Sequence, residues 1–121
     1  MLRTILKSKI YHAKVTQTEL YYEGSITIDE DLMEKADILP NEKVEVLNLN
    51  NGSRIETYAI KGKKKSGVIC LNGPSARFAC KNDDLIILSY FLVEDSKAKK
   101  IKPKIVYVDK YNRVKNKTLA E

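Results

Sequence analysis

Residues 24–40 read Gly-Ser-Ile-Thr-Ile-Asp-Glu-Asp-Leu-Met-Glu-Lys-Ala-Asp-Ile-Leu-Pro, and this stretch predicts a strand that passes directly into a helix. Residues 25–28 are rich in β-branched side chains, as is typical of a strand. Asp29 can cap the helix, and the acidic residues after it suit the N-terminal end of the helix dipole. The helix should end before Pro40. Its predicted apolar face consists of Leu32, Met33 and Ala36.

Six other short stretches have the composition of β-strands. They are rich in β-branched and aromatic residues, and turn residues separate them. These stretches are 5–15, 43–49, 54–60, 68–71, 85–93 and 101–108. Asn50-Asn51-Gly52-Ser53 predicts a hairpin turn, because Asn and Gly tolerate positive φ, and Asn72-Gly73-Pro74 predicts a further break. Many short strands with one or two short helices predict a mainly β fold in the form of a closed β-barrel.

The length of the chain predicts a single domain over residues 1–121. Hydrophobic residues make up 43% and charged residues 31% of the chain, which is enough for a packed core and a solvated surface. No apolar run approaches the roughly 20 residues of a membrane helix. Residues 1–10 lack the uninterrupted apolar stretch of a signal peptide. We therefore expect a cytoplasmic protein that does not bind membranes.

Cysteine and histidine are too scarce for a disulfide framework or a standard four-ligand zinc site. The chain has two cysteines, Cys70 and Cys80, and a single histidine, His12. Cys70 lies in an apolar run and is interpreted as a small buried hydrophobe. His12 is interpreted as a structural or surface residue. We expect no metal site.

The net charge of +6 is concentrated near the C-terminus, where residues 96–121 hold nine Lys or Arg and two acidic residues. Such a basic tail can contact phosphates, but lysines on a solvated end explain it as well. The strand, helix and strand of residues 25–48 also occur in small DNA-binding dimers with swapped hairpins. The alternative function is therefore a DNA-binding small β-barrel or swapped-hairpin regulator, although we do not expect a nucleic-acid partner.

The dipeptide Gly24-Ser25 can support cleavage of its own peptide bond where the chain is strained. Glycine has no side chain to shield its carbonyl, so the hydroxyl that follows can attack it and move the acyl group from nitrogen to oxygen. Elimination from the ester leaves dehydroalanine, which hydrolyses to a pyruvoyl group. By itself, however, Gly-Ser is an ordinary turn dipeptide.

A series of short motifs matches one family in order and spacing. The motifs are Arg3-Thr4, Lys7-Ser8-Lys9, Lys14-Val15-Thr16, Tyr22-Glu23-Gly24-Ser25, Ile28-Asp29, Ile38-Leu39, Asn51-Gly52, Arg54, Thr57-Tyr58-Ala59-Ile60 and Asn72-Gly73. From Met1 to about Leu92 the chain thus resembles the aspartate alpha-decarboxylases, which are pyruvoyl enzymes that make β-alanine for pantothenate biosynthesis. Residues after Glu94 match the family poorly.

The resemblance implies a double-psi β-barrel that assembles as a homotetramer, with active sites between subunits. It implies a zymogen that is cleaved autocatalytically between Gly24 and Ser25, into chains 1–24 and 25–121. The larger chain then begins with a covalent pyruvoyl cofactor, which forms a Schiff base with L-aspartate and accepts the electrons left by CO₂. The implied activity is that of a carboxy-lyase. Whether a maturation factor assists cleavage is left open.

The family roles fall on matching positions of this chain. Ser25 becomes the pyruvoyl group, and Tyr58 is the implied proton donor, since a phenol keeps its proton at neutral pH. Thr57 is an implied substrate and processing contact, whose hydroxyl can hold the Gly24 carbonyl. Because side chains alternate along a strand, Thr57 and Tyr58 should point to opposite faces.

The implied substrate-binding residues are Lys9, Arg54, Thr57, Asn72, Gly73, Pro74 and Ser75. Arg54 is the natural bidentate partner for a carboxylate of aspartate, with Lys9 as a second cation. The family typically has alanines where this chain has Pro74 and Ser75. Proline has no amide hydrogen, so we expect a backbone contact from Ser75 rather than from Pro74. A second departure is Tyr11, where the family is expected to have histidine.

Overall fold

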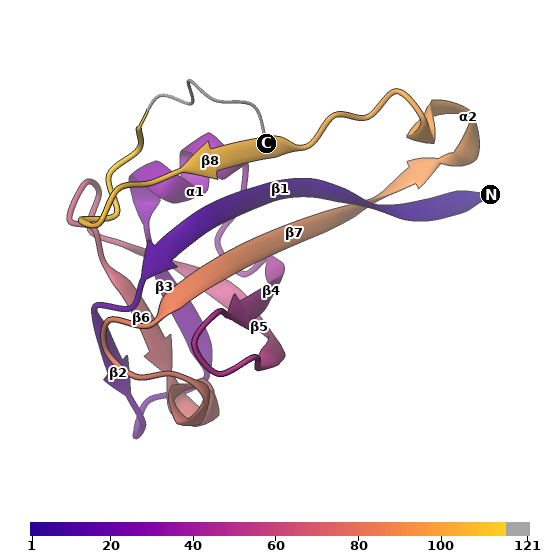
Figure 1. Cartoon of the computed structure of the whole chain (residues 1–121). Helices are drawn as coiled ribbons and strands as arrows, with labels where there is room; N and C mark the ends of the chain where they lie inside the picture. Colours follow the sequence, from indigo (N-terminus) through magenta and orange to yellow (C-terminus); the bar gives the residue numbers. More distant parts are fainter. Residues whose placement is uncertain (116–121) are drawn as a thin grey trace.

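The computed structural model describes residues 1–115 and shows a mainly β protein with short helices (Figure 1). The strands are β1 (Leu2–Lys14), β2 (Gln17–Glu19), β3 (Ser25–Asp29), β4 (Lys43–Asn48), β5 (Arg54–Gly62), β6 (Ile69–Asn72), β7 (Asp84–Glu94) and β8 (Lys104–Tyr107). The helices are α1 (Glu30–Ala36), α2 (Asp95–Ala98) and the 3₁₀ helix η1 (Gly73–Phe78). The mainly β prediction is confirmed.

The strands form one mixed sheet in the order β2-β6-β3-β5-β4-β7-β1-β8. Neighbours in this order are often distant in sequence, and β1 with β8, β2 with β6 and β3 with β5 are parallel pairs. The sheet curves strongly, so that α1 lies against β1 and β8 (Figure 1). This arrangement is consistent with the predicted barrel.

Local sequence signals account for the ends of α1. The Asp29 side chain accepts a hydrogen bond from the Asp31 N–H at 2.8 Å, which caps the helix as predicted. Asp37 ends the helix in the left-handed conformation, with φ of +57°. The predicted apolar face is buried, and it consists of Leu32, Met33 and Ala36. The cap joins β3 directly to α1, and the buried face of α1 packs against the core.

The core lies on one face of the central strands. Its largest fully buried side chains are Ile10, Ile26, Ile28, Leu32, Ile69, Leu71, Leu85 and Ile87. Burial of each such side chain contributes roughly 1.5–3 kcal/mol. Because side chains alternate along a strand, the residues between these on β3 and β6 point to the opposite face.

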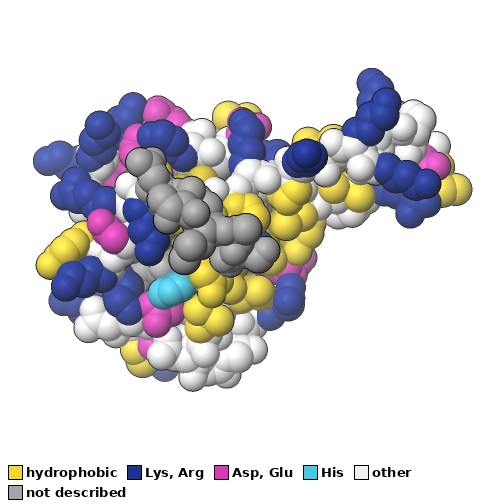
Figure 2. Space-filling view, turned by 45° about the horizontal axis from the view of Figure 1, so that its top comes forward, with side chains coloured by type: hydrophobic (Ala, Val, Ile, Leu, Met, Phe, Trp, Pro, Cys, Tyr) yellow, Lys and Arg dark blue, Asp and Glu magenta, His cyan; other side chains and the backbone are white. Residues whose placement is uncertain are grey.

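Strand β1 lies between two partners. It pairs antiparallel with β7 from Leu2 to Lys14 and parallel with β8 from Ser8 to Tyr11. The outer part of the β1–β7 pair projects from the body as an arm that carries the N-terminus and α2 (Figures 1 and 2). We call this part, residues 1–6 and 90–98, the arm.

The basic residues near the C-terminus are part of the fold up to the end of the described chain. Val106 and Val108 are buried. The buried Asn112 side chain accepts from the Lys14 N–H at 2.7 Å and donates to the carbonyls of Lys14 and Gly67, both at 2.8 Å. The described Lys and Arg side chains of this segment are all exposed, as the interpretation of a solvated basic end predicts, but uncharged residues between them anchor the backbone to the fold. The rest of the tail, residues 116–121, lies outside the described residues.

Candidate active site

Ser25, the first residue of β3, is buried in a strained backbone conformation. Its φ is +121°, a region that residues other than glycine rarely adopt. Such a conformation costs on the order of 1–3 kcal/mol and persists only where the surroundings impose it. The side chain is only 1% exposed. The prediction of self-cleavage required strain at Gly24-Ser25, and the structure shows strain at this serine.

Tyr58 of β5 reaches the peptide bond that precedes Ser25. Strands β3 and β5 run parallel, with Ile26 opposite Ala59, so the preceding residues also lie close together. The Tyr58 Oη donates a hydrogen bond to the Gly24 carbonyl oxygen at 3.2 Å. A donor at this position polarises the carbonyl and stabilises negative charge that develops on its oxygen.

Thr57, which was predicted to hold the Gly24 carbonyl, faces the other way. Exposure alternates along β5, with Tyr58 exposed and Thr57 less so, as the strand period predicts. None of the hydrogen bonds of residues 1–115 joins Thr57 to Gly24 or Ser25. The hydrogen bond that sequence reasoning gave to Thr57 is made by the neighbouring tyrosine, and a role for Thr57 remains a prediction.

Asn72 of β6 contacts the Ser25 hydroxyl. Ser25 and Asn72 lie opposite each other in the antiparallel β3–β6 pair. The Asn72 Nδ2 donates to the Ser25 Oγ at 3.0 Å and to the Thr27 Oγ1 at 2.9 Å, and its Oδ1 accepts from the Cys70 Sγ at 3.3 Å. Asn72 is 3% exposed. Both the NH₂ group and the oxygen of its amide therefore form hydrogen bonds next to the candidate nucleophile.

Gly73 allows the chain before Ser25 to lie directly against η1. Its φ is +63°. A Cβ at this position would lie 2.5 Å from the Tyr22 carbonyl oxygen and 3.0 Å from the Gly24 nitrogen, closer than side-chain carbons approach backbone. A glycine is required here because both the conformation and the contact exclude a side chain.

Pro74 and Ser75 follow within η1. Pro74 occupies the first turn of this helix, where its missing N–H is not needed. Pro74 is exposed and Ser75 is buried. Both residues lie next to Gly73, as the loop assignment predicts, and the expected backbone contact from Ser75 to substrate stays a prediction.

Lys9 and Arg54 lie apart from Ser25 within one chain. Lys9 is on β1, and strands β5, β4 and β7 lie between β1 and β3 in the sheet. Arg54 begins β5, about 13 Å along the strand from Tyr58 at roughly 3.3 Å per residue. Its Nη1 donates to the Glu45 Oε1 at 2.6 Å. A single chain therefore does not bring these two predicted cations to the serine.

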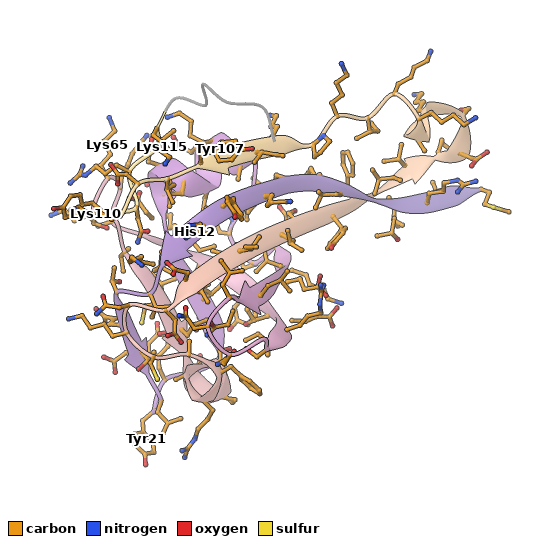
Figure 3. All side chains as sticks on the ribbon, in the orientation of Figure 1. His12, Tyr21, Lys65, Tyr107, Lys110 and Lys115 are labelled. Carbon is orange, nitrogen blue, oxygen red and sulfur yellow. The ribbon has the colours of Figure 1, made fainter. Side chains whose placement is uncertain are left out.

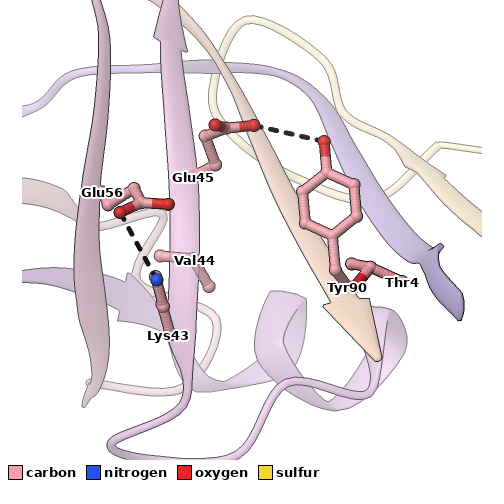
Figure 4. A pocket seen from close by; sticks show the side chains of 6 residues that line it. All are labelled: Thr4, Lys43, Val44, Glu45, Glu56 and Tyr90. Carbon is pink, nitrogen blue, oxygen red and sulfur yellow. Dashed lines mark hydrogen bonds and ion pairs between the residues drawn. The ribbon is translucent and has the colours of Figure 1, made fainter. Parts of the chain in front are cut away.

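The Glu45 carboxylate that holds Arg54 also lines a pocket (Figure 4). The pocket residues are Thr4, Lys43, Val44, Glu45, Glu56 and Tyr90. The Tyr90 Oη donates to the Glu45 Oε1 at 3.1 Å. Burial, and next the hydrogen bond and charge of Glu45, raise the pKa of Tyr90. The pocket is next to Arg54 and does not include the residues around Ser25.

The sequence analysis assigned no functional role to two residues near Ser25. Cys70 is buried, as predicted, but its thiol also donates to Asn72, and Thr27 accepts from the same amide. The strand period places Thr27 on the same face of β3 as Ser25, and Cys70 on the same face of β6 as Asn72. The register between β3 and β6 is what brings these two pairs of side chains together. Within residues 1–115, no group of three or more His, Cys, Asp and Glu side chains could hold a metal ion.

The fold and the site define a small mainly β domain built around a buried serine at a strained glycine–serine junction. Comparison with known proteins identifies the particular family. The model of the aspartate decarboxylase family matches residues 1–115, and the chain belongs to this family. The expectation that the resemblance ends near Leu92 is wrong, because the match continues through β8, while the expected poor similarity after Glu94 stays a prediction.

Similar proteins cover nearly all of the chain. The aspartate 1-decarboxylase of Thermoanaerobacter pseudethanolicus is 55% identical over 116 residues, which is 96% of this chain and 99% of the relative. That of Cytophaga hutchinsonii is 54% identical over 110 residues, or 91% and 96% of the two chains. That of Clostridium beijerinckii is 52% identical over 121 residues, or 100% and 98%.

Among the described residues, none of the helices has the length and apolar character needed to span a membrane.

Proposed function

We propose that this chain is a carboxy-lyase that converts L-aspartate to β-alanine and CO₂, in the branch of metabolism that supplies pantothenate. Membership of the aspartate decarboxylase family and relatives of more than half identical sequence over their whole length support this function. The observation that carries it is the Gly24-Ser25 junction, where a strained, buried serine lies between Asn72 and the Tyr58 that contacts the preceding carbonyl.

The junction supports cleavage of the chain by its own serine. The Ser25 Oγ attacks the Gly24 carbonyl carbon, the C–N bond breaks, and the hydroxyl proton passes to the Ser25 nitrogen, which leaves an ester and an amine. Loss of the Ser25 α-proton then breaks the Cβ–Oγ bond and releases Gly24 as a carboxylate. One water hydrolyses the remaining enamine to a ketone with release of ammonia. The products are residues 1–24 and residues 25–121.

The residues around position 25 fit a pyruvoyl group made in this way. When formed, that group supplies a ketone that condenses with the substrate amine and accepts the electron pair left by CO₂. The phenol of Tyr58, freed from the Gly24 carbonyl by cleavage, is then positioned to give a proton to the carbanion. The Asn72 side chain and the loop that it begins are assigned to binding of the substrate. The chain itself provides the reactive group.

The carboxylate of L-aspartate that is not lost as CO₂ must also be bound, and the positions of the candidate residues for it support an assembly of several chains. Lys9 and Arg54 suit a carboxylate, but a single chain does not place them beside Ser25. The arm exposes apolar side chains, with Leu92 at 65%, which is typical of a surface that packs against another protein. We therefore assign the active site to an interface between subunits of a homotetramer. The cytoplasmic location stays a prediction.

The comparisons favour the enzyme over the DNA-binding alternative. The basic residues that suggested a nucleic-acid partner do not gather on one surface, since Lys97 lies on α2 in the arm and Lys110 and Lys115 lie on the body of the molecule. Figure 3 also shows Lys110 and Lys115 at the opposite end of the body from Tyr21, which is in the loop before Gly24-Ser25. We assign no nucleic-acid partner.

The test is the intact mass of the purified chain together with CO₂ release from L-aspartate. The wild-type chain should give the 1–24 and 25–121 fragments, the larger one starting with a keto group. Ser25→Ala should stay intact and inactive. Ser53→Ala, which removes a hydroxyl in the β4–β5 turn, should behave as wild type. Cleavage in buffer alone would show that no maturation factor is needed. Full activity of an uncut chain, or of Ser25→Ala, would overturn the proposal.

A further inference from the structure

Four side chains form a square around the hydroxyl of Ser25. In the antiparallel β3–β6 pair, Ser25 lies opposite Asn72 and Thr27 lies opposite Cys70. Because side chains alternate along a strand, all four point to the same side, away from the core. We call these four residues the Ser25 square. Thr27 and Cys70 have no part in the proposed chemistry, although they complete the square.

The square uses both hydrogens and the oxygen of the Asn72 amide. One amide hydrogen goes to Ser25 and the other to Thr27, at 3.0 and 2.9 Å, while the amide oxygen accepts from the Cys70 thiol at 3.3 Å. Rotation of the amide by half a turn would place its oxygen against the two hydroxyls and its NH₂ against the sulfur. The Cys70 thiol donates to the amide oxygen and the Thr27 hydroxyl accepts from the NH₂ group, and both contacts favour the orientation in which the NH₂ group faces the serine.

The orientation of the amide matters for transfer of the serine proton. With the NH₂ group toward Ser25, the Oγ accepts a hydrogen bond, and its own hydrogen remains free to reach the Ser25 nitrogen as the C–N bond breaks. With the amide oxygen toward Ser25, the hydroxyl would donate to Asn72. That hydrogen bond would hold the proton away from the nitrogen that must receive it.

The thiol is suited to hold this orientation because it keeps its hydrogen. Burial, and next the negative charge of Glu19, raise the pKa of Cys70 above its ordinary value of 9.0, while a hydrogen bond with Gln17 acts in the opposite direction. At neutral pH the sulfur thus presents a hydrogen to the amide oxygen rather than a negative charge that would repel it.

We propose that Cys70 and Thr27 are positioning residues for chain cleavage, which fix the Asn72 amide so that it donates to the Ser25 hydroxyl. This inference rests on the proposed self-cleavage at Gly24-Ser25. If Cys70 only filled space, any small apolar side chain could replace it. The proposal instead gives its thiol a specific role.

The first test is the rate at which freshly synthesised chain is cut, followed by intact mass. Cys70→Ala and Thr27→Val remove one hydrogen-bonding group each with little change in shape, and each should slow cleavage about five- to tenfold, the effect of one lost hydrogen bond. Cys70→Ser and Thr27→Ser keep that group and should stay within about twofold of wild type. Cys80→Ala, at the exposed cysteine, should have no effect.

The second test does not require cleavage. In the uncut Ser25→Ala chain, labelled with ¹⁵N, the side-chain NH₂ signals of Asn72 should shift or broaden when Cys70→Ala is added and should recover with Cys70→Ser. Unchanged signals, or cleavage of Cys70→Ala and Thr27→Val at the wild-type rate, would overturn the inference. Cys70→Ser as slow as Cys70→Ala would also overturn it, because the sulfur would then act by packing alone. A wild-type chain that never cleaves would instead overturn the proposed function, and with it the role of the square in cleavage.

Discussion

Substitution of Gly73 tests whether the contact between η1 and residues 22–24 places the scissile bond. In Gly73→Ala, an L-residue must adopt φ of +63°, which costs about 1–2 kcal/mol. Its Cβ would lie 2.5 Å from the Tyr22 carbonyl oxygen and 3.1 Å from the Gly24 Cα, so the backbone must move. Overpacking of this kind costs about 1–3 kcal/mol. The variant should therefore lose about 2–5 kcal/mol of stability.

The larger effect should fall on cleavage, since the displaced segment contains the carbonyl that Ser25 attacks. A shift of about 1 Å between reacting groups can slow a reaction roughly 100-fold. Intact mass against time gives the cleavage rate. Urea unfolding of the same variant in a Ser25→Ala background gives the stability of the single uncut chain.

Two other glycines separate the local effect from general destabilisation. Gly67→Ala has nearly the same conformation and contact, with φ of +78° and a Cβ 2.6 Å from the Tyr111 carbonyl oxygen, but it lies in another turn. Gly52→Ala has φ of +76° and open space around the added carbon. Both should lose stability and cleave at the wild-type rate. Equal slowing in Gly67→Ala and Gly73→Ala would refute the local explanation, as would cleavage of Gly73→Ala at full speed.

Two further predictions concern a hydroxyl and a carboxylate. Tyr58→Phe loses the hydrogen bond to the Gly24 carbonyl and should slow cleavage roughly five- to tenfold. The cut protein should release no CO₂ from aspartate. Retained CO₂ release would exclude this phenol as the proton donor. Burial alone would raise the pKa of Glu42, but hydrogen bonds from the Lys7 ammonium, the Ser89 hydroxyl and a backbone N–H outweigh it and lower the pKa below its ordinary value of 4.5. A lowered pKa in the folded state stabilises the protein above the ordinary value, and this stabilisation is lost as the pH falls through the folded-state value. The free energy of unfolding is measured in urea from about pH 7 down to about pH 3. In Glu42→Gln it should fall less steeply with decreasing pH than in the wild-type chain. An equally steep fall would contradict the assignment.

The local features of the fold could be predicted because they depend on neighbours in sequence. The strand at Ser25, the Asp29 cap and the β4–β5 turn each follow from a short pattern, and the structure contains all three. Strand β2 was missed because three residues carry no period, and its position depends on pairing with β6. The strand near the C-terminus was predicted, but the buried turn after it was not, because Asn112 is an ordinary turn residue until Lys14 and Gly67 surround it.

The candidate site was only partly predictable for a similar reason. The importance of Ser25, Tyr58 and Asn72 was inferred from family motifs, and the structure brings these three together. Their contacts depend on parallel pairing with β5 and antiparallel pairing with β6, which a single sequence does not specify. For that reason neither the contact of Cys70 with the asparagine nor the contact of the tyrosine, rather than Thr57, with the glycine carbonyl could be predicted.

The position of β1 between β7 and β8 has a consequence for unfolding and refolding of the enzyme. All of β1 belongs to the 24-residue fragment produced by the proposed cut, while both of its partner strands belong to the larger fragment. The cut peptide should stay bound, because β1 pairs with β7 over its whole length and with β8 from Ser8 to Tyr11. Once denatured, however, the mature protein must find that strand by collision between two molecules, so its recovery should depend on concentration. In the uncut precursor β1 is covalently joined to β7 and β8, so this pairing step should not depend on concentration.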